Sequence, residues 1–260
     1  MTDSQRPHLR PSFIIVGAQR AGTSSLFRML TLHQQVISPR AKELHFFDRD
    51  EIYGGGIDDY WSLFPRDPGN GMLITGEATP SYLYLDEVPG RIHRHLPDVT
   101  IVAILRDPVK RAFSAWNMYR TFSTFPGREH LFDPRTFDAA IEEELAGGGE
   151  NRAHRYLERG YYARQLRRYS ELFGREQVHV FGYPQLINDR VGVIDRIFKA
   201  TGIPPFNGDM GSLDVRKNML NYAKGIHPAL EARMRDHLAP HMQELDELLG
   251  IALDLNEAPR

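Results

Sequence analysis

Cysteine is absent from the 260 residues of this sequence. Its absence excludes disulfide bonds, cysteine-ligated zinc, iron–sulfur clusters and thiol nucleophiles. No apolar run approaches the roughly 20 residues that a membrane-spanning helix needs. The first residues, MTDSQRPHLRPS, are polar and lack the apolar core of a secretory signal. We therefore expect a cytoplasmic protein without a transmembrane segment.

A large excess of charge of one sign is also absent. The chain has 32 basic and 34 acidic side chains, so its formal net charge is −2. Duplex nucleic acid is bound by a strongly basic surface, and nucleic acid is therefore not predicted as a partner. Any anion site must be a local concentration of donors. The hydrophobic content of 41% is typical of a globular protein. The chain is long enough to bury a sizeable core.

Hydrophobic patterning predicts an α/β fold. Short apolar runs that are typical of buried strands in a parallel sheet occupy residues 13–17, 72–75, 99–105 and 177–181. Apolar residues at helical spacing predict a helix that includes residues 26–30. The same spacing predicts helices over 108–120, 136–146, 160–173, 190–201, 227–238 and 240–250. Pro240 is expected to separate the last two helices.

The order of these elements predicts the architecture. Alternation of strands and helices indicates a single α/β domain over 13–260, with a central, mostly parallel sheet flanked by helices. A flexible arm is expected over residues 1–12. Long loops are expected at 34–60, 120–135 and 203–226, where turn-forming and polar residues interrupt the pattern.

A glycine-containing loop follows the first predicted strand. Backbone N–H groups in such a turn, at the start of a helix, form a cradle for an anion. In the loop of nucleotide triphosphatases a lysine would stand where this chain has Thr23, and Arg20 supplies a cation instead. The alternative is a plain strand–turn–helix with capping hydroxyls. The cation and the consecutive hydroxyls favour a P-loop-like phosphate site made of Arg20, Ala21, Gly22, Thr23, Ser24 and Ser25.

Arg106 ends the strongest predicted strand, and Ser114 follows eight residues later. Ligands of open α/β sheets bind at the carboxyl ends of strands. An arginine can hold a phosphate through two hydrogen bonds, and a serine can add one more. An exposed arginine paired with Asp107, beside a surface serine, is the alternative for this segment taken alone.

The segment Lys42-Glu43-Leu44-His45-Phe46-Phe47-Asp48 alternates ionisable and apolar side chains. Glu43 and His45 would share one face of an extended chain, and Asp48 could fold back on His45. A carboxylate oriented in this way is a candidate general base. A solvated loop anchored by its two phenylalanines is the alternative.

Taken together and in this order, the segments resemble the PAPS-dependent sulfotransferases, especially the branch of the heparan sulfate sulfotransferases and their bacterial relatives. The P-K-x-G-T-T loop of that family corresponds to residues 19–24, and its R-D-P-x-x-R-x-x-S motif is matched in full by residues 106–114. The K-E-x-H-F-F-D segment of the 3-O-sulfotransferases resembles residues 42–48, and E-x-[ST]-P-x-Y resembles residues 77–82. The resemblance covers most of the chain.

The resemblance implies a site and a reaction. Glu43 would be the general base, supported by His45 and Asp48, and Lys42 and Glu77 would contact the substrate. The donor would be PAPS (3′-phosphoadenosine 5′-phosphosulfate), held by Arg20 to Ser25, Arg106 and Ser114. Arg20 replaces the family's lysine, keeping its charge but not its geometry. Arg216 and Lys217 are all that remains of the family's basic C-terminal cofactor loop.

The implied reaction is in-line transfer of a sulfuryl group to a hydroxyl or, as the weaker alternative, an amine. No metal is implied, because side chains and helix N-termini can neutralise the phosphates. A P-loop kinase and a non-catalytic nucleotide- or glycan-binding module are the competing interpretations. The acceptor is expected to be a small molecule, a glycolipid or a saccharide, since the net charge gives little sign of a groove for a long polyanion. Residues 49–70, 120–135 and 203–226 are expected to shape its pocket. A homodimer is compatible with the sequence.

Overall fold

The structure, a computed structural model, describes residues 6–69, 71, 73–208 and 225–256. Two compact units make up the chain. One, the sheet unit, comprises residues 1–105 and 165–215. The other, the helical unit, comprises residues 106–164 and 216–260.

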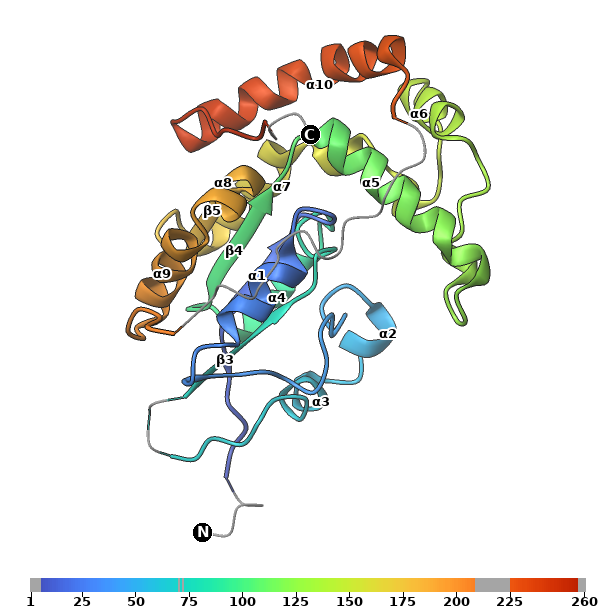
Figure 1. Cartoon of the computed structure of the whole chain (residues 1–260). Helices are drawn as coiled ribbons and strands as arrows, with labels where there is room; N and C mark the ends of the chain where they lie inside the picture. The colour runs from blue at the N-terminus through green and yellow to red at the C-terminus, as the bar shows by residue number, and fades with distance from the viewer. Residues whose placement is uncertain (1–5, 70, 72, 209–224, 257–260) are drawn as a thin grey trace. The chain divides into compact units, whose positions relative to one another are not determined.

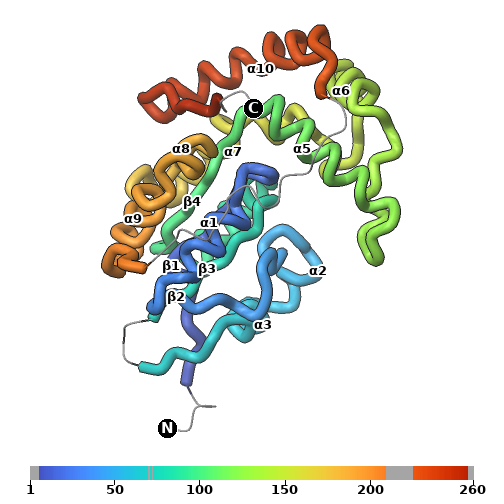
Figure 2. Tube along the Cα trace, in the orientation of Figure 1, coloured from blue at the N-terminus to red at the C-terminus, as the bar shows by residue number. Residues whose placement is uncertain are grey.

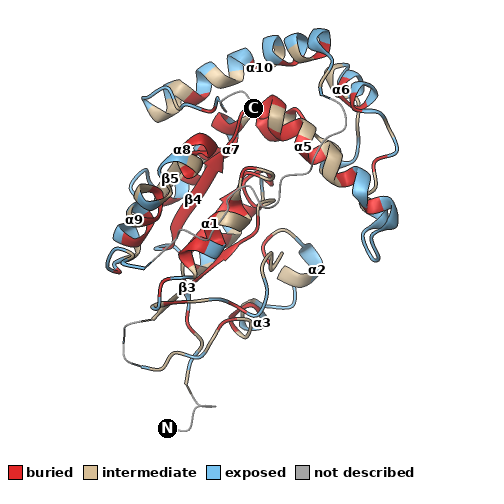
Figure 3. Cartoon of the chain, in the orientation of Figure 1, coloured by how far each residue is buried: buried red, intermediate tan, exposed pale blue. Residues whose placement is uncertain are grey.

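The sheet unit is built on five parallel strands (Figures 1 and 2). Their order across the sheet is β2-β3-β1-β4-β5. The strands are β1 (Pro11–Gly17), β2 (Val36–Ile37), β3 (Ile74–Ala78), β4 (Thr100–Leu105) and β5 (Val178–Gly182). Every residue of β4 is buried, which explains why this strand gives the strongest signal in the sequence (Figure 3). The predicted α/β class and parallel central sheet are confirmed.

Helices of the sheet unit follow the strands along the chain. They are α1 (Thr23–Leu30), α2 (Asp50–Tyr53), α3 (Ile57–Trp61), α4 (Val88–His95), α8 (Tyr183–Asn188) and α9 (Arg190–Thr201). Most of α7 (Tyr162–Phe173) also belongs to this unit. Buried Leu26 and Leu30 of α1 and Ile194 and Ile197 of α9 have the three- or four-residue spacing of a helix face packed on a core.

The helical unit contains α5 (Pro108–Arg120), α6 (Phe137–Leu145) and α10 (Pro228–Leu249). Short 3₁₀ turns occupy Thr121–Thr124, Glu129–Leu131, Arg152–His154 and Glu158–Gly160. Its core is a cluster of buried side chains that includes Val109, Tyr119, Phe137, Tyr156 and Met234. Asp107 caps α5 by accepting a hydrogen bond from the Lys110 amide, and Pro108 occupies the first helical turn, where no amide donor is needed.

Pro240 does not end a helix, and the prediction of two separate helices at 227–238 and 240–250 was wrong. The residues form one helix, α10, with Pro240 inside it. A proline removes one helical hydrogen bond and clashes with the preceding turn, at a cost of about 3 kcal/mol. Side chains are buried on both sides of the proline, Leu238 before it and Leu245 after it, and this burial offsets the cost.

Other differences have local causes. The expected loop at 34–60 contains β2, α2 and α3, which are only two to five residues long and give no periodic signal. Strand β3 lies at 74–78 rather than 72–75. Its residues include Gly76, against which the Phe13 ring packs, and the buried polar Glu77, so the strand does not look like an apolar run.

Residues 6–10 of the expected arm lie against residues 64–68. The amide of Leu9 donates to the carbonyl oxygen of Pro65 at 2.8 Å, and His8 forms an antiparallel bridge with Arg66. Leu9 is buried. The described part of the arm is thus bonded to the sheet unit, and residues 1–5 lie outside the described residues.

Candidate active site

The loop between β1 and α1 is held against the neighbouring strand. The amide of Ala18 donates to the carbonyl oxygen of Ile104 in β4 at 2.7 Å, and the amide of Ala21 donates to the carbonyl oxygen of Ala18 at 3.1 Å. Arg20 (φ 69°) and Gly22 (φ 90°) both adopt the left-handed conformation. Two left-handed residues turn the chain sharply from the strand into the helix, as a loop that wraps an anion requires.

Gly22 cannot be replaced by a larger residue without strain. Besides its positive φ, a Cβ atom here would lie 2.9 Å from Tyr183 Cε2 and 3.2 Å from Leu186 Cδ2. Both side chains are buried members of α8. The glycine therefore lets the loop and α8 approach closely while the start of α1 stays uncovered by a side chain at position 22.

Helix α1 has no side-chain cap, because its N-cap residue is Gly22. The hydroxyls of Thr23, Ser24 and Ser25 lie inside the first turn, with Thr23 buried and the two serines half-buried. The first amides of a helix have no partner within the helix. The absence of a capping side chain at this helix favours the anion cradle over the alternative in which the hydroxyls merely cap it.

The segment 42–48 brings its ionisable side chains together, although not as an extended chain. Glu43 and His45 have φ values of 61° and 52°, so the backbone is left-handed at both positions and the expected alternation of faces does not apply. Asp48 does fold back: its Oδ2 lies 2.8 Å from His45 Nδ1. His45 Nε2 lies 3.8 Å from Glu43 Oε2, and Lys42 Nζ donates to Glu43 Oε1 at 2.8 Å.

Interactions within this cluster favour a negative charge on Glu43 and a positive charge on His45. Burial acts to raise the pKa of Glu43, but interactions with His45 and Lys42 outweigh it and lower that pKa to about 2. Burial acts to lower the pKa of His45, but bonds to Asp48 and Glu43 raise it to about 9. At neutral pH the cluster thus holds an ionised Glu43 beside a protonated His45. The Glu43 side chain is 36% exposed and remains accessible to a ligand.

A buried layer supports the cluster. Glu77 of β3 is fully buried, and its two oxygens accept hydrogen bonds from Tyr60 (2.6 Å) and Thr79 (3.0 Å). Burial raises the pKa of Glu77 to about 7. Glu77 was predicted to contact the substrate, but its carboxylate has no exposed surface and accepts from two internal donors, which favours a supporting role.

Tyr82 and Ser81 form hydrogen bonds that hold the segment 42–48 in place. The Tyr82 hydroxyl accepts hydrogen bonds from the amides of Phe46 (3.0 Å) and Phe47 (3.3 Å), and Ser81 Oγ donates to Asp48 Oδ2 at 2.5 Å. No role was predicted for these residues or for Tyr60. Ser81 and Tyr82 belong to the E-x-[ST]-P-x-Y segment. The motif therefore marked them as candidate site residues, although their spacing alone gave them no role.

The raised pKa of His45 predicts a pH-dependent stability. A group whose pKa rises on folding stabilises the folded state fully below its unfolded value, near 6.5, and loses this contribution as the pH rises through about 9. The free energy of unfolding of the wild type, from urea titrations, should therefore decrease between pH 6 and pH 9.5. His45→Gln should decrease less over this interval. Equal slopes for the two proteins would show that His45 gains no protonated-state contacts on folding.

Arg106 and Ser114 lie in the helical unit, Arg106 directly after β4 in the chain and Ser114 within α5. Both are buried, at 7% and 1% exposure. The Tyr162 hydroxyl donates to the Arg106 carbonyl oxygen at 2.8 Å, and Asp107 forms an ion pair with Arg235 at 3.0 Å. The exposed arginine and surface serine of the alternative interpretation are therefore not what the structure shows.

Arg111, in the same motif, was not assigned a role. It is fully buried and donates from Nη2 to the Tyr156 carbonyl oxygen. Within the described residues its Nε and Nη1 have no hydrogen-bond partner, and burial lowers its pKa. Arg216 and Lys217, the remaining predicted cofactor residues, lie outside the described residues.

A family model described as the sulfotransferase domain matches residues 10–224. The chain belongs to the sulfotransferase family. The match extends over segments of both compact units, as expected for one sulfotransferase domain. The resemblance to PAPS-dependent sulfotransferases that the motifs indicated is thereby confirmed.

Individual sulfotransferases agree with this assignment. A solved sulfotransferase from Alicyclobacillus acidocaldarius is 30% identical, with a TM-score of 0.72, 94% of this chain covered and 97% of that one. Human heparan sulfate glucosamine 3-O-sulfotransferase 5 is 29% identical over 94% of this chain and 73% of its own length. Human bifunctional heparan sulfate N-deacetylase/N-sulfotransferase 3 is 31% identical over 75% of this chain and 22% of its own length.

No helix among the described residues has the length and apolar character needed to cross a bilayer.

Proposed function

We propose that this sulfotransferase transfers the sulfuryl group of PAPS to a hydroxyl of a saccharide, in line, with Glu43 as the general base. The observation that carries the proposal is the accessible, ionised carboxylate of Glu43 held between Lys42 and His45, itself braced by Asp48. The names of the two human relatives support a saccharide over the small molecules and glycolipids that the sequence left open.

The protonation states favour Glu43 over His45 as the base. A general base must be unprotonated when the acceptor arrives. With a pKa of about 9, His45 already carries its proton at pH 7, whereas Glu43, with a pKa of about 2, is ionised. A carboxylate of low pKa is a weak base towards a resting alcohol, but the hydroxyl becomes far more acidic as its oxygen bonds to sulfur. Glu43 then accepts the proton late in the step.

Donor binding follows from the loop and the helix start. PAPS, when bound, supplies the sulfuryl group and leaves as adenosine 3′,5′-bisphosphate. The left-handed turn at Gly22 and the first amides of α1 fit a phosphate group. Arg20 would balance the negative charge that grows on the leaving phosphate oxygens, so catalysis there is electrostatic and positional. Arg106 and Ser114 would bind the 3′-phosphate.

Nucleotide preference tests this function against its two alternatives. We expect adenosine 3′,5′-bisphosphate to raise the Tm more than ATP with Mg²⁺ does, and labelled PAPS to transfer its sulfuryl group to a saccharide. A preference for ATP with Mg²⁺ would favour a kinase and contradict the proposal. Nucleotide binding without transfer to any saccharide tested would favour a binding module. Transfer only to amino sugars with a free amine would replace the hydroxyl by the amine as the acceptor.

Arg20 provides a further prediction. Arg20→Lys should retain substantial turnover, because the charge stays in the loop and the related family motif has lysine here. Arg20→Ala should lose most turnover, because no cation within the loop would balance the leaving phosphate. Both substitutions keep a Cβ atom at φ 69°, so they leave the left-handed strain unchanged. The measurement is kcat with saturating PAPS. Wild-type kcat in Arg20→Ala would show that the backbone amides act alone.

A further inference from the structure

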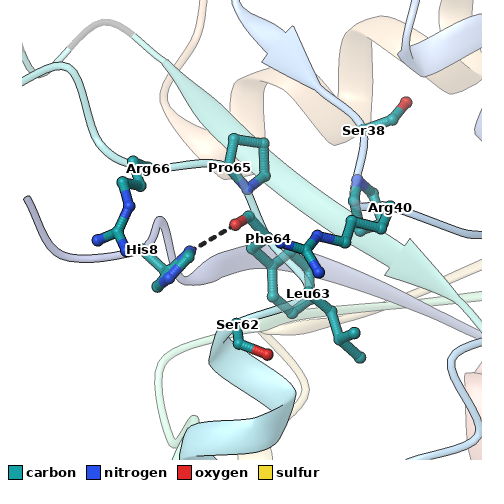
Figure 4. A pocket seen from close by; sticks show the side chains of 9 residues that line it. His8, Ser38, Arg40, Ser62, Leu63, Phe64, Pro65 and Arg66 are labelled. Carbon is teal, nitrogen blue, oxygen red and sulfur yellow. Dashed lines mark hydrogen bonds between the residues drawn. The ribbon is translucent and has the colours of Figure 1, made fainter. Parts of the chain in front are cut away.

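A pocket lies in the sheet unit, between the described part of the N-terminal arm and the chain that follows β2 and α3. It has a volume of about 460 Å³, within the usual range of ligand sites. His8 and Arg66 line one side and Arg40 the other, with Phe64 between them (Figure 4). None of these residues belongs to the cluster around Glu43 or to the phosphate loop.

The lining of this pocket is cationic. It contains two arginines, a histidine and two serines, Ser38 and Ser62, but no aspartate or glutamate. In the described part of the chain, the Arg40 guanidinium has no hydrogen-bond or ion-pair partner, while its backbone amide is fixed by the Leu63 carbonyl oxygen at 2.9 Å. Arg66 donates from one terminal nitrogen to the Arg6 carbonyl oxygen. The pocket therefore gathers positive charge without an acidic side chain in its lining.

The His8 ring is held by a hydrogen bond to the lining of the pocket. Its Nδ1 lies 2.6 Å from the carbonyl oxygen of Phe64, which can only accept, so Nδ1 carries a hydrogen and donates it. Protonation of the ring would add a second donor at Nε2 without breaking this bond. Two forked guanidinium groups around one cavity form a donor set suited to the oxygens of a carboxylate or a sulfate, and the protonated form of His8 would add Nε2 to that set.

We propose that this pocket binds an acidic group of the acceptor, a carboxylate or a sulfate, through Arg40, Arg66 and His8. The identification of the acceptor as the source of that group rests on the proposed saccharide acceptor. The oxyanion site itself rests only on the pocket and its donors.

The chain connects this pocket to the proposed base. Arg40 precedes Glu43 by three residues, so their Cα atoms lie within about 11 Å of each other. One saccharide chain could place a hydroxyl at Glu43 and an acidic group on a neighbouring sugar at Arg40. The pocket would then select acidic saccharides, although the protein as a whole carries a net charge of −2.

Anion binding can be measured independently of activity. The full chain, labelled with ¹⁵N-histidine and saturated with adenosine 3′,5′-bisphosphate to fill the phosphate loop, is titrated with sodium sulfate and, separately, with glucuronate at constant ionic strength. His8→Gln identifies the ring signals of His8. We expect a saturable shift of these signals in the wild type. Arg40→Ala should bind at least about tenfold more weakly, the loss expected for one charge-assisted hydrogen bond.

The control variant is Arg94→Ala, which removes an exposed arginine of α4 in the same unit and does not line the pocket. It should titrate like the wild type, and Arg40→Lys should bind with intermediate strength because it keeps the charge and loses the fork. No saturable shift in the wild type, or equal affinity in Arg40→Ala, would overturn the oxyanion site.

Acceptor kinetics test the second half of the proposal. Arg40→Ala should raise KM for an acidic saccharide about tenfold, with kcat and the KM for PAPS unchanged, and should not change KM for a neutral saccharide. An unchanged KM for the acidic saccharide would show that the pocket does not bind the acceptor. If the wild type sulfated no saccharide, the proposed function would fail, while the histidine titration would still decide whether the pocket binds an oxyanion.

Discussion

Glu43→Gln is expected to lower kcat by about 10²–10⁴-fold with saturating PAPS, the usual contribution of a positioned general base. The substitution is nearly isosteric and keeps an acceptor oxygen, but the amide cannot take a proton from the acceptor. Affinity for adenosine 3′,5′-bisphosphate should stay close to that of the wild type, because Glu43 is assigned to the acceptor rather than to the phosphates. Steady-state kinetics and calorimetry on the same preparation measure both quantities.

His45→Ala distinguishes the two candidate bases. If His45 only orients Glu43 and holds it ionised, its loss should reduce kcat less than Glu43→Gln does. The matched control is His93→Ala, a half-buried histidine on α4 whose ring packs on Phe173 and which, in the described part of the chain, forms no hydrogen bond or ion pair with the cluster. A larger loss of kcat in His45→Ala than in Glu43→Gln, with both variants folded and able to bind the nucleotide, would assign the base to His45.

The fold could be predicted where one physical signal dominates. Strands β1 and β4 each contain a continuous apolar run, residues 13–16 and 101–105, because these residues are buried in the centre of the sheet unit. Helix α5 begins at a proline with an aspartate before it. Strand β3 is different, since Gly76 accommodates a phenylalanine ring and Glu77 is a buried carboxylate. Those two residues serve tertiary packing and the site, and they erase the local strand signal.

Helix α10 shows the opposite case, in which a strong local signal was overridden. A proline normally ends a helix, so local propensity predicts two helices separated at Pro240. Leu230, Met234 and Leu238, before the proline, are buried in the core of the helical unit, and Leu245, after it, is buried as well. The stabilisation from this burial cannot be compared with the cost of the proline from the sequence alone, because the sequence does not show which core the helix faces.

The site residues were recognisable as a set but not in their arrangement. Spacing predicted that Asp48 could reach His45, and it does. Spacing could not predict left-handed backbone at Glu43 and His45, because neither is a glycine and the conformation is imposed by the surroundings. The Tyr82 hydroxyl, 36 residues from Phe46 in the chain, is part of those surroundings and could be found only in three dimensions.

Arg106→Ala is expected to weaken the binding of adenosine 3′,5′-bisphosphate by about 10- to 100-fold, and Ser114→Ala by about 2- to 10-fold. The guanidinium would form charge-assisted hydrogen bonds with the 3′-phosphate, worth about 1.5–3 kcal/mol, whereas the serine offers one neutral donor worth about 0.5–1.5 kcal/mol. Isothermal calorimetry measures both affinities. Because both side chains are buried, each variant should first be shown to keep its cooperative thermal transition.

Two further variants make the Arg106 result specific. Arg233→Ala removes an arginine of the same unit whose side chain is 57% exposed and paired with Glu142, and it should leave the affinity unchanged, since exposed ion pairs contribute little. Arg106→Lys should recover part of the affinity, because it restores the charge without the fork. If Arg106→Ala bound the nucleotide as tightly as the wild type, the R-D-P-x-x-R-x-x-S motif would not hold the 3′-phosphate in this chain. The donor would then have to be held mainly by the loop that precedes α1.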